Sequence, residues 1–448
     1  MGYFDEEYRS KLVTAEEAVK IVKSGDWLDW GQCLSNPYAL DTALAARKDE
    51  LEDIKIRLCG SMKFHDIWKA DPTGETFTWT SWHFIGGDRK QFEKDNTFYI
   101  PDLLRNNPLY YRKSLCNESD VAMIRVTSMD KHGYFNLGCS TGLIRAICDV
   151  AKTIIVEVCP SMPWACGGDG EELIHISEVD YIVECDSPIA NVPPAAPSDI
   201  DKKIAENVMT QITDGACIQL GIGGMPNMVG TLLAESDLKD LGCHTEMLVD
   251  AYYHLWKAGK LTNKHKNVNK GKSVWGFAMG SDFLYDWIDH NPGLATYPFD
   301  YTNDPHVIGS IDNFVSINNC LEVDLYGQVS SESSGIRQIS GTGGQLDFVT
   351  GAYLSKGGKS IICCTSSFTD KEGNLKSRIV PTLIPGTAVS VPRNQTHLII
   401  TEYGIADLAG RSTWERTERL ISVAHPDLRD ELVANAEKMK IWRRSNKR

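Results

Sequence analysis

Residues 216–234 read ACIQLGIGGMPNMVGTLLA, and their order of apolar residues and glycines predicts the fold class. The apolar run Ala216–Leu220 predicts a strand, the glycine-rich segment Gly221–Asn227 predicts a turn, and Met228–Ala234 predicts a helix. Glycine permits a tight turn and lets the backbone approach a ligand closely. A strand, a glycine turn and a helix in this order are typical of α/β domains, in which strands alternate with helices around a mostly parallel sheet.

The same alternation occurs on both sides of a proline-rich segment. Before that segment, strand-like apolar runs alternate with helix-like pieces, at 41–51, 120–127, 142–150, 151–158 and 179–185. The segment Asp186–Ser198 holds four prolines within ten residues, which fit neither a helix nor the middle of a sheet. We therefore predict two tandem α/β domains with mostly parallel sheets, at residues 1–190 and 199–448, joined by a linker at 191–198.

Composition and charge argue against several classes of protein. The chain has 448 residues, of which 42% are hydrophobic and 24% charged, as in soluble globular proteins. Its net charge of −14 argues against nucleic acid as a partner. No run approaches the roughly 20 apolar residues of a membrane span, so we expect no membrane partner. The thirteen cysteines lack metal-ligand spacing, and several lie in apolar runs, so we expect reduced thiols, no metal and a cytoplasmic location.

Two glycine clusters are candidate anion-binding turns. Gly221–Asn227 lacks the Lys-Ser/Thr pair of a Walker loop, and Pro226 stands in place of the third small residue of a dinucleotide fingerprint. Taken alone, it fits a plain turn and an anion site at a helix N-terminus equally well. Gly341–Gly344 precedes a second helix-like segment at 348–354. Its consecutive amides can form a nest that stabilises an oxyanion, or again a plain turn.

Glu246 is a candidate nucleophile, because its carboxylate follows the glycine turn and lies at the start of an apolar segment. Three other glutamates, Glu322, Glu332 and Glu402, compete with it, and each of the four is equally well explained as a surface or hydrogen-bonded acid. Asn318 ends an apolar run and is placed to donate to a substrate carbonyl, although asparagine is more often a turn residue. The residues alone do not rank these alternatives.

Six motifs taken together resemble the acetyl-CoA hydrolase/CoA-transferase family. In chain order they are SMDKHGYF at 128–135, GIGGMP at 221–226, HTEM at 244–247, LEVDLYGQ at 321–328, GTGG at 341–344 and TEYGIADL at 401–408. The resemblance spans nearly the whole chain and rests on the order and number of the motifs. One position departs from the pattern, since Ala409 stands where an arginine is expected.

The resemblance implies two tandem CoA-transferase-type α/β domains with the active site at their interface. It implies that Glu246 is the catalytic nucleophile, and that Asn318 and the amides near Gly343 and Gly344 hold the thioester oxygen. It also implies that both glycine turns bind CoA. The residues concerned are Gly221, Ile222, Gly223, Gly224 and Met225 in the first turn, and Gly341 and Gly344 in the second.

The implied reaction moves CoA from a short-chain acyl-CoA to a carboxylic acid, with butyryl-CoA the favoured donor and acetate the acceptor. Glu246 carries CoA as a thioester between two half-reactions, which is nucleophilic catalysis with ping-pong kinetics. Thioester exchanges for thioester, so no cofactor is expected. The alternatives are a hydrolase, a transferase acting on 4-hydroxybutyrate, and a non-enzymatic or sugar-phosphate-binding α/β protein. The family also implies a homo-oligomer.

Overall fold

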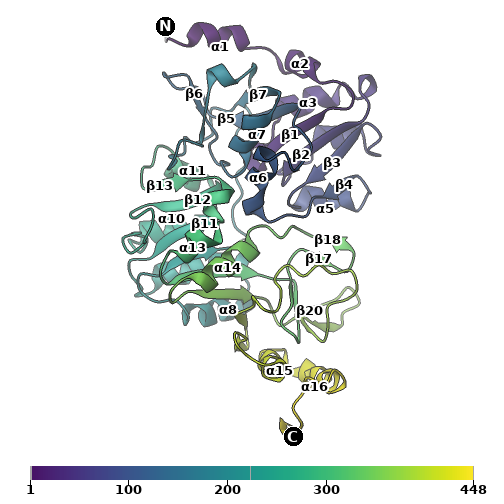
Figure 1. Ribbon diagram of the computed structural model, residues 1–448, viewed down its shortest axis with the longest axis vertical. Helices are drawn as coiled ribbons and strands as arrows, with labels where there is room; N and C mark the ends of the chain where they lie inside the picture. The colour runs from purple at the N-terminus through teal and green to yellow at the C-terminus, as the bar shows by residue number, and fades with distance from the viewer. Residues whose placement is uncertain (1–2, 222, 447–448) are drawn as a thin grey trace. The chain divides into compact units, whose positions relative to one another are not determined.

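The computed structural model describes residues 3–221 and 223–446, which form alternating strands and helices (Figure 1). They belong to two compact units. The first unit takes the chain up to Val192 together with Val274–Thr302, and the second takes Pro193–Ser273 together with the chain from Asn303 onward. The units are therefore interleaved in sequence, whereas the predicted domain ranges are contiguous. The segment 274–302 groups with the first unit.

The first unit is built on a seven-stranded sheet in the order β4-β3-β2-β1-β5-β7-β9, with every pair parallel. Its strands are β1 (Trp27–Gln32), β2 (Ile54–Cys59), β3 (Phe77–Ser81), β4 (Thr97–Tyr99), β5 (Val121–Val126), β7 (Thr153–Val158) and β9 (Tyr181–Glu184). Leu28 and Trp30 of β1 share an apolar core with side chains of helices α3 (Ala39–Ala45) and α4 (Asp66–Ala70). The parallel α/β sheet predicted for this part of the chain is confirmed.

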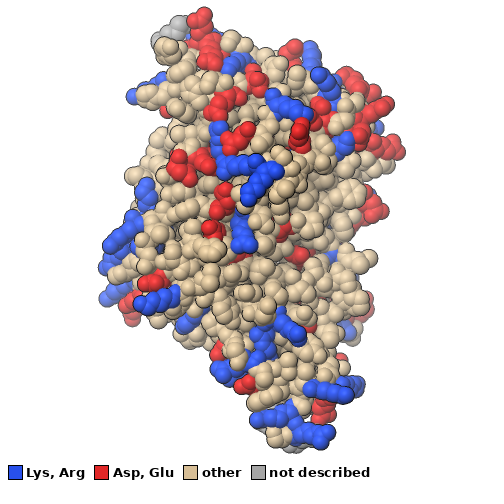
Figure 2. Space-filling view, in the orientation of Figure 1, with Lys and Arg blue, Asp and Glu red and all other residues tan. Residues whose placement is uncertain are grey.

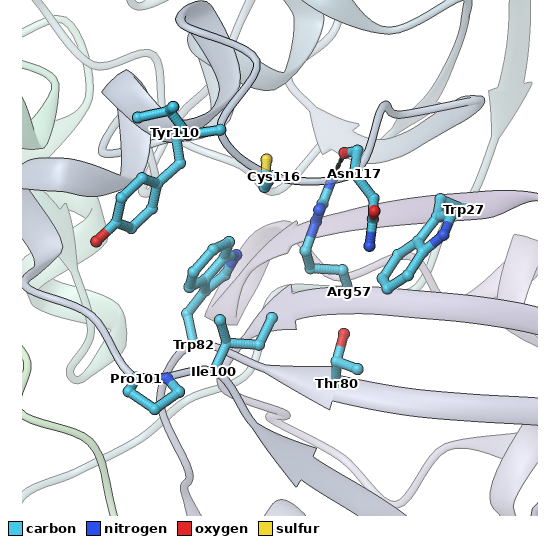
Figure 3. A pocket seen from close by; sticks show the side chains of 10 residues that line it. Trp27, Arg57, Thr80, Trp82, Ile100, Pro101, Tyr110, Cys116 and Asn117 are labelled. Atoms are coloured by element: carbon cyan, nitrogen blue, oxygen red, sulfur yellow. Dashed lines mark hydrogen bonds between the residues drawn. The ribbon is translucent and has the colours of Figure 1, made fainter.

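The opposite face of β1 and β2 buries an ion pair. Arg57 Nε and Nη2 each lie 2.8 Å from a carboxylate oxygen of Asp29, and the two side chains are 2% and 1% exposed. The Tyr111 hydroxyl also donates to Asp29, at 2.7 Å. Figure 3 shows Arg57 in the wall of a cavity of about 540 Å³, near Trp27 and Trp82. Asp29 compensates the guanidinium charge, and the sequence-predicted site residues are not among those that line this cavity.

Within the second unit the strands follow the order β11-β10-β14-β19-β23-β24. They are β10 (Cys217–Leu220), β11 (Gly242–Leu248), β14 (Phe314–Asn319), β19 (Lys359–Cys363), β23 (Leu398–Thr401) and β24 (Gly404–Asp407). The pairs are parallel except that of β23 with β24. The longer helices of this unit are α8 (Asp199–Met209), α9 (Gly224–Glu235), α10 (Asp250–Lys257), α14 (Gln345–Leu354), α15 (Thr413–Ser422) and α16 (Arg429–Lys438).

Residues 216–234 form the predicted strand, turn and helix, but the helix begins earlier than predicted. β10 ends at Leu220, and α9 starts at Gly224 instead of Met228. Pro226 lies in the first turn of α9, where its missing N–H is not needed and its fixed φ suits a helix. The connection is therefore short, and Gly223 adopts a φ of 121°, a conformation that favours glycine.

The surface carries charges of both signs. Figure 2 shows Lys and Arg side chains interspersed with Asp and Glu over the visible face, although the formal charge is −14. Nowhere in residues 3–221 and 223–446 does a helix combine the length and apolar content needed to cross a bilayer. In the same ranges, no three His, Cys, Asp or Glu residues are grouped so as to hold a metal ion.

Candidate active site

The ends of neighbouring strands in the second unit bring several predicted motifs together. The sheet order reverses at β10, because α9 leads from it to β11 on one side while β14 lies on the other. In open parallel sheets, ligands bind at such a switch point, outside the carboxyl ends of the strands. Ile218 of β10 is in register with Cys243 of β11. Extending that register places Gly221, the first residue of the glycine turn, beside Glu246.

Two hydrogen bonds hold the Glu246 carboxylate. Asn303 Nδ2 lies 2.7 Å from Glu246 Oε2, and the backbone N–H of Gly344 also donates to the carboxylate. Glu246 is partly exposed, whereas its neighbours on β11 are buried. Burial nevertheless dominates and raises the pKa of Glu246 to about 7, against the opposing effect of the two hydrogen bonds. A carboxyl group with that pKa is substantially ionised at neutral pH and is more basic than an ordinary carboxylate, as a nucleophile requires.

Gly344 is a glycine because there is no space for a side chain. A Cβ at this position would lie 2.0 Å from Glu246 Oε2 and 2.2 Å from Asn303 Nδ2. Its φ of −94° suits any residue, so the requirement is spatial. Gly343 beside it has a φ of 59°, in the left-handed region. The turn that opens at Gly341 therefore carries the backbone onto the Glu246 carboxylate just before α14 begins.

The three rival glutamates are engaged in other ways. Ser366 donates its N–H and its hydroxyl to Glu402, at 2.9 and 2.7 Å. A threonine hydroxyl from the second glycine turn donates to Glu332. Burial raises the pKa of Glu322, and a nearby arginine opposes that rise. Of the four glutamates, Glu246 is the one that accepts a backbone N–H from the second glycine turn. It is also the one that the strand register places beside Gly221 of the first glycine turn.

Asn318 pairs with Gln219 across the neighbouring strands β14 and β10. Gln219 Nε2 donates to Asn318 Oδ1 at 3.2 Å, and Asn318 Nδ2 donates to Gln219 Oε1 at 3.1 Å. Asn318 is adjacent to the glycine turn, because a Cβ at Gly221 would lie 3.6 Å from its Oδ1. The pair uses one of the two N–H groups of the Asn318 amide, so the bond to Gln219 can persist while the other N–H donates to a substrate carbonyl. Its role as an oxyanion donor stays a prediction.

The first glycine turn lines a cavity of about 210 Å³ at the switch point. Gly224 and Met225 line it from the start of α9, a helix of 12 residues whose N-terminal amides attract anions. Ile222, also predicted to bind CoA, lies outside the described residues. The other lining residues come from α8, from the last residues of β14 and β19 and the residues just after them, and include one arginine: Asp201, Ile204, Asn319, Cys320, Leu321, Cys363, Cys364, Thr365 and Arg378.

Sequence reasoning missed two residues of this arrangement. Gln219 lies inside the apolar strand β10, and a buried polar side chain needs a partner, which was a usable signal. Asn303 follows the short helix α12 (Phe299–Thr302) and belongs to no motif. Its bond to Glu246 joins residues 57 apart in the chain, so no local pattern announces it.

Comparison with known proteins identifies the family. Residues 2–193 match the model of the acetyl-CoA hydrolase/transferase N-terminal domain, and residues 280–436 match that of the C-terminal domain. The chain is 55% identical to the probable butyrate:acetyl-CoA coenzyme A-transferase of Syntrophomonas wolfei, over 99% of this chain and 98% of that one. It is 53% identical to the butyryl-CoA:acetate CoA-transferase of Anaerostipes caccae, over 99% of this chain and 100% of that one. The crystal structure of RipA from Yersinia pestis matches with a TM-score of 0.90 at 36% identity, covering 97% of this chain and 99% of that chain.

The sequence motifs, the parallel sheets and the near-complete coverage of these relatives agree. The family predicted from the motifs is therefore confirmed, and so is the class of enzyme. The chain belongs to the acetyl-CoA hydrolase/transferase family and is an enzyme of the CoA-transferase type.

Proposed function

We propose that this enzyme transfers CoA from butyryl-CoA to acetate through a glutamyl-CoA thioester on Glu246. Two relatives that are more than half identical to the chain are named for butyrate or butyryl-CoA together with acetyl-CoA or acetate. The main support for this mechanism is the state of the Glu246 carboxylate. It has a pKa of about 7, is held by Asn303 and Gly344, and lies near the carboxyl end of its strand.

The first half-reaction loads CoA onto the enzyme. A carboxylate oxygen of Glu246 attacks the thioester carbonyl of butyryl-CoA, the C–S bond breaks, and CoA leaves as its thiolate. The product is a mixed anhydride of butyrate and Glu246. The thiolate then attacks the glutamyl carbonyl carbon, which releases butyrate and forms the glutamyl-CoA thioester.

The second half-reaction runs the same steps in reverse with the other acid. Acetate attacks the glutamyl thioester and expels CoA thiolate, which forms the anhydride of acetate and Glu246. The thiolate attacks the acetyl carbonyl, so acetyl-CoA leaves and the Glu246 carboxylate is regenerated. One thioester replaces another throughout, so the exchange requires no ATP, metal or redox group.

The surroundings of Glu246 balance two needs. The carboxylate must be ionised to attack, and it must be basic enough to form a bond to carbon. Burial raises its basicity, while the bonds from Asn303 and Gly344 keep an ionised fraction at neutral pH. We assign the developing oxyanion to Asn318 and the amide of Gly343, where each donor is expected to contribute on the order of 3 kcal/mol.

The cavity at the switch point is the proposed site for part of CoA. The amides at the N-terminus of α9 and the guanidinium of Arg378 offer positive charge there. Binding energy from parts of CoA remote from the thioester then helps to place the acyl group against Glu246. The glycines at the turn permit this close approach of backbone and ligand.

One assay tests the reaction. The purified protein is incubated with butyryl-CoA, with and without acetate, and acetyl-CoA and free CoA are followed. We expect acetyl-CoA to form only with acetate, with little free CoA. Free CoA formed equally fast without acetate would establish the hydrolase instead. Faster transfer to 4-hydroxybutyrate than to acetate would identify 4-hydroxybutyrate as the preferred acceptor. The absence of any reaction with short acyl-CoA thioesters would refute the proposal.

A second experiment tests the nucleophile. After treatment with acyl-CoA and reduction with borohydride, peptide mass spectrometry should find the modification on Glu246. The Glu246→Gln variant should lose transfer by several orders of magnitude, whereas Glu372→Gln, which alters an exposed carboxylate, should keep it. Modification of Glu322, Glu332 or Glu402 instead would reject the assignment.

A further inference from the structure

Two cysteines of the second unit occupy adjacent positions just after two neighbouring parallel strands. Asn319, the last residue of β14, is in register with Cys363 of β19, and the N–H of Cys320 donates to the carbonyl of Cys363 at 3.0 Å. Cys320 and Cys364 are therefore the next pair along. Neighbouring strands lie about 4.7–4.9 Å apart, and disulfides join residues whose Cα atoms are about 4.4–6.8 Å apart. The backbone thus places these two cysteines at a distance that a disulfide spans.

The two side chains also meet. A side-chain hydrogen bond joins Cys320 and Cys364, and this bond together with burial raises the pKa of Cys320. Both thiols are free. Cys320 is partly exposed, whereas Cys364 is 6% exposed, so a reagent in solution reaches Cys320 first. Cys364 then lies behind it as the second thiol.

Both cysteines line the cavity at the switch point, together with Gly224, Met225 and Arg378. This point rests on the proposed function, under which the cavity receives part of CoA. A molecule that carries the CoA group on a disulfide instead of a thioester has the same recognition elements. Asn318, the predicted donor to the thioester carbonyl, lies two residues before Cys320, so the sulfur of such a molecule arrives close to the wall that contains Cys320 and Cys364.

We propose that Cys320 and Cys364 form a thiol–disulfide exchange site that reacts with disulfides of CoA. In the first step the Cys320 sulfur attacks one sulfur of the CoA disulfide. A Cys320–S–S–CoA bond forms, the original S–S bond breaks, and the departing CoA thiolate takes the proton from Cys320. In the second step Cys364 attacks the Cys320 sulfur, which releases the second CoA thiol with the proton of Cys364. Two protein thiols are oxidised to one disulfide, and one CoA disulfide is reduced to two CoA thiols.

Two consequences follow for the enzyme. The mixed disulfide at Cys320 occupies the cavity next to Gly224 and Met225, so it excludes acyl-CoA while it lasts. The rate of the first step rises with pH, because the thiolate is the nucleophile and Cys320 holds its proton tightly. Reduction of the Cys320–Cys364 disulfide by a dithiol restores both thiols.

The experiment uses the full chain, reduced and free of oxygen, with CoA disulfide as the probe. After reaction, the remaining thiols are alkylated and peptides are analysed by mass spectrometry. We expect a cross-link between the peptides of Cys320 and Cys364, with two CoA thiols released per cross-link formed. In the Cys364→Ser variant the reaction should stop at a Cys320–CoA adduct. In the Cys320→Ser variant neither product should form, and Cys116→Ser, which removes another partly exposed thiol, should react as the native chain does.

A parallel reaction with glutathione disulfide separates recognition from simple reactivity. Prior binding in the cavity makes the exchange effectively unimolecular, so CoA disulfide should react roughly ten-fold faster or more. Equal rates with the two disulfides would overturn the proposal. Modification of other cysteines while Cys320 stays reduced would also overturn it. So would a Cys320–CoA adduct in the native chain that Cys364 does not convert to the cross-link.

The outcome is independent of the transfer assay. Thiol products and cross-linked peptides are counted without any acyl transfer, so a failed exchange leaves the transfer reaction of Glu246 intact as a proposal. Conversely, a cross-link in a chain without transfer activity would leave the exchange site in place and remove only the proposed function. In an active chain, oxidation should lower the initial transfer rate at least several-fold, and a dithiol should restore it.

Discussion

Asn303 donates to Glu246 Oε2 at 2.7 Å, across 57 positions of the chain. This bond opposes the burial that raises the pKa of Glu246 to about 7. Asn303 is neutral, so it stabilises the carboxylate without forming an ion pair that would suppress its basicity. The same carboxylate oxygen leaves no room for a side chain at Gly344. A side-chain amide and a backbone turn therefore hold the candidate nucleophile from two parts of the second unit.

Replacing Asn303 by alanine should move the acid limb of the pH profile upward. The hydrogen bond lowers the pKa of Glu246, so its loss raises that pKa further. A hydrogen bond to a charged group is worth roughly 1.5–3 kcal/mol, which corresponds to about one to two pH units. Transfer at neutral pH should fall roughly ten-fold and recover toward alkaline pH, as kcat/KM measured against pH will show.

The matched control for this variant is Asn394→Ala, which removes an exposed amide of the same unit. Its pH profile should match that of the native chain. If Asn303→Ala loses activity equally at every pH, Asn303 positions the site without tuning its acid.

The Gly344→Ala variant should lose activity for steric reasons. The added Cβ would lie 2.0 Å from Glu246 Oε2, so either the carboxylate or the turn must move. Overpacking of this kind costs about 1–3 kcal/mol of stability, and misplacement of a reacting group by about 1 Å costs on the order of 100-fold in rate. Unfolding in urea and steady-state kinetics measure the two effects.

Gly86→Ala is the corresponding control, because a Cβ there meets nothing within 4 Å and the backbone has no positive φ. This variant should change neither the stability in urea nor the steady-state rate appreciably. Full activity in Gly344→Ala would show that the turn shifts freely despite its close contact with Glu246.

The Glu246→Gln variant should be more stable than the native chain at alkaline pH. The folded-state pKa of Glu246, about 7, lies above the usual 4.5, so burial favours the protonated form. Its contribution to stability is complete below the unfolded-state pKa and is lost as pH rises through about 7. Glutamine does not ionise, so the variant avoids a loss on the order of 1–3 kcal/mol.

Urea unfolding at about pH 5 and about pH 8 tests this dependence. The difference between the variant and the native chain should be larger at the higher pH. A difference that does not change with pH would mean that the ionisation of Glu246 is not linked to folding. Glu372→Gln supplies the control with an exposed carboxylate.

Breaking the buried ion pair of the first unit should destabilise the protein. The Asp29→Leu variant leaves the Arg57 guanidinium, 2% exposed, without its carboxylate. Removing one partner of a buried pair costs about 3–5 kcal/mol, whereas replacing both partners by apolar residues costs much less. The double variant Asp29→Leu/Arg57→Met should therefore unfold at a higher urea concentration than the single variant.

Asp49→Leu, at a 98% exposed side chain, should behave as the native chain. If the single and double variants at the ion pair unfold at the same urea concentration, the uncompensated charge is not the source of the loss. Circular dichroism and tryptophan fluorescence follow the transitions.

The elements of the fold were predictable because their signals are local. Strands that are buried on both faces have mostly apolar sequences, and β5 (Val121–Val126), which is apolar except for Arg125, is buried at every position. Helix starts were less accurate. Glycine and proline suggest a turn through Asn227, yet Gly224 and Pro226 occupy the first turn of α9, where both are tolerated. The order of units along the chain also has no local signal, because 274–302 groups with the first unit through contacts distant in sequence.

Residue order and short-range pattern are enough to predict the family, the parallel α/β architecture and the two glycine turns. Physical reasoning from the sequence does not rank Glu246 above Glu322, Glu332 or Glu402 as the nucleophile, and only the family resemblance singles out Glu246. Only the three-dimensional arrangement brings Glu246 to Asn303 and Gly344 and raises its pKa to about 7. The pKa of a carboxyl group depends on its burial and on donors within hydrogen-bonding distance, and the folded structure sets both.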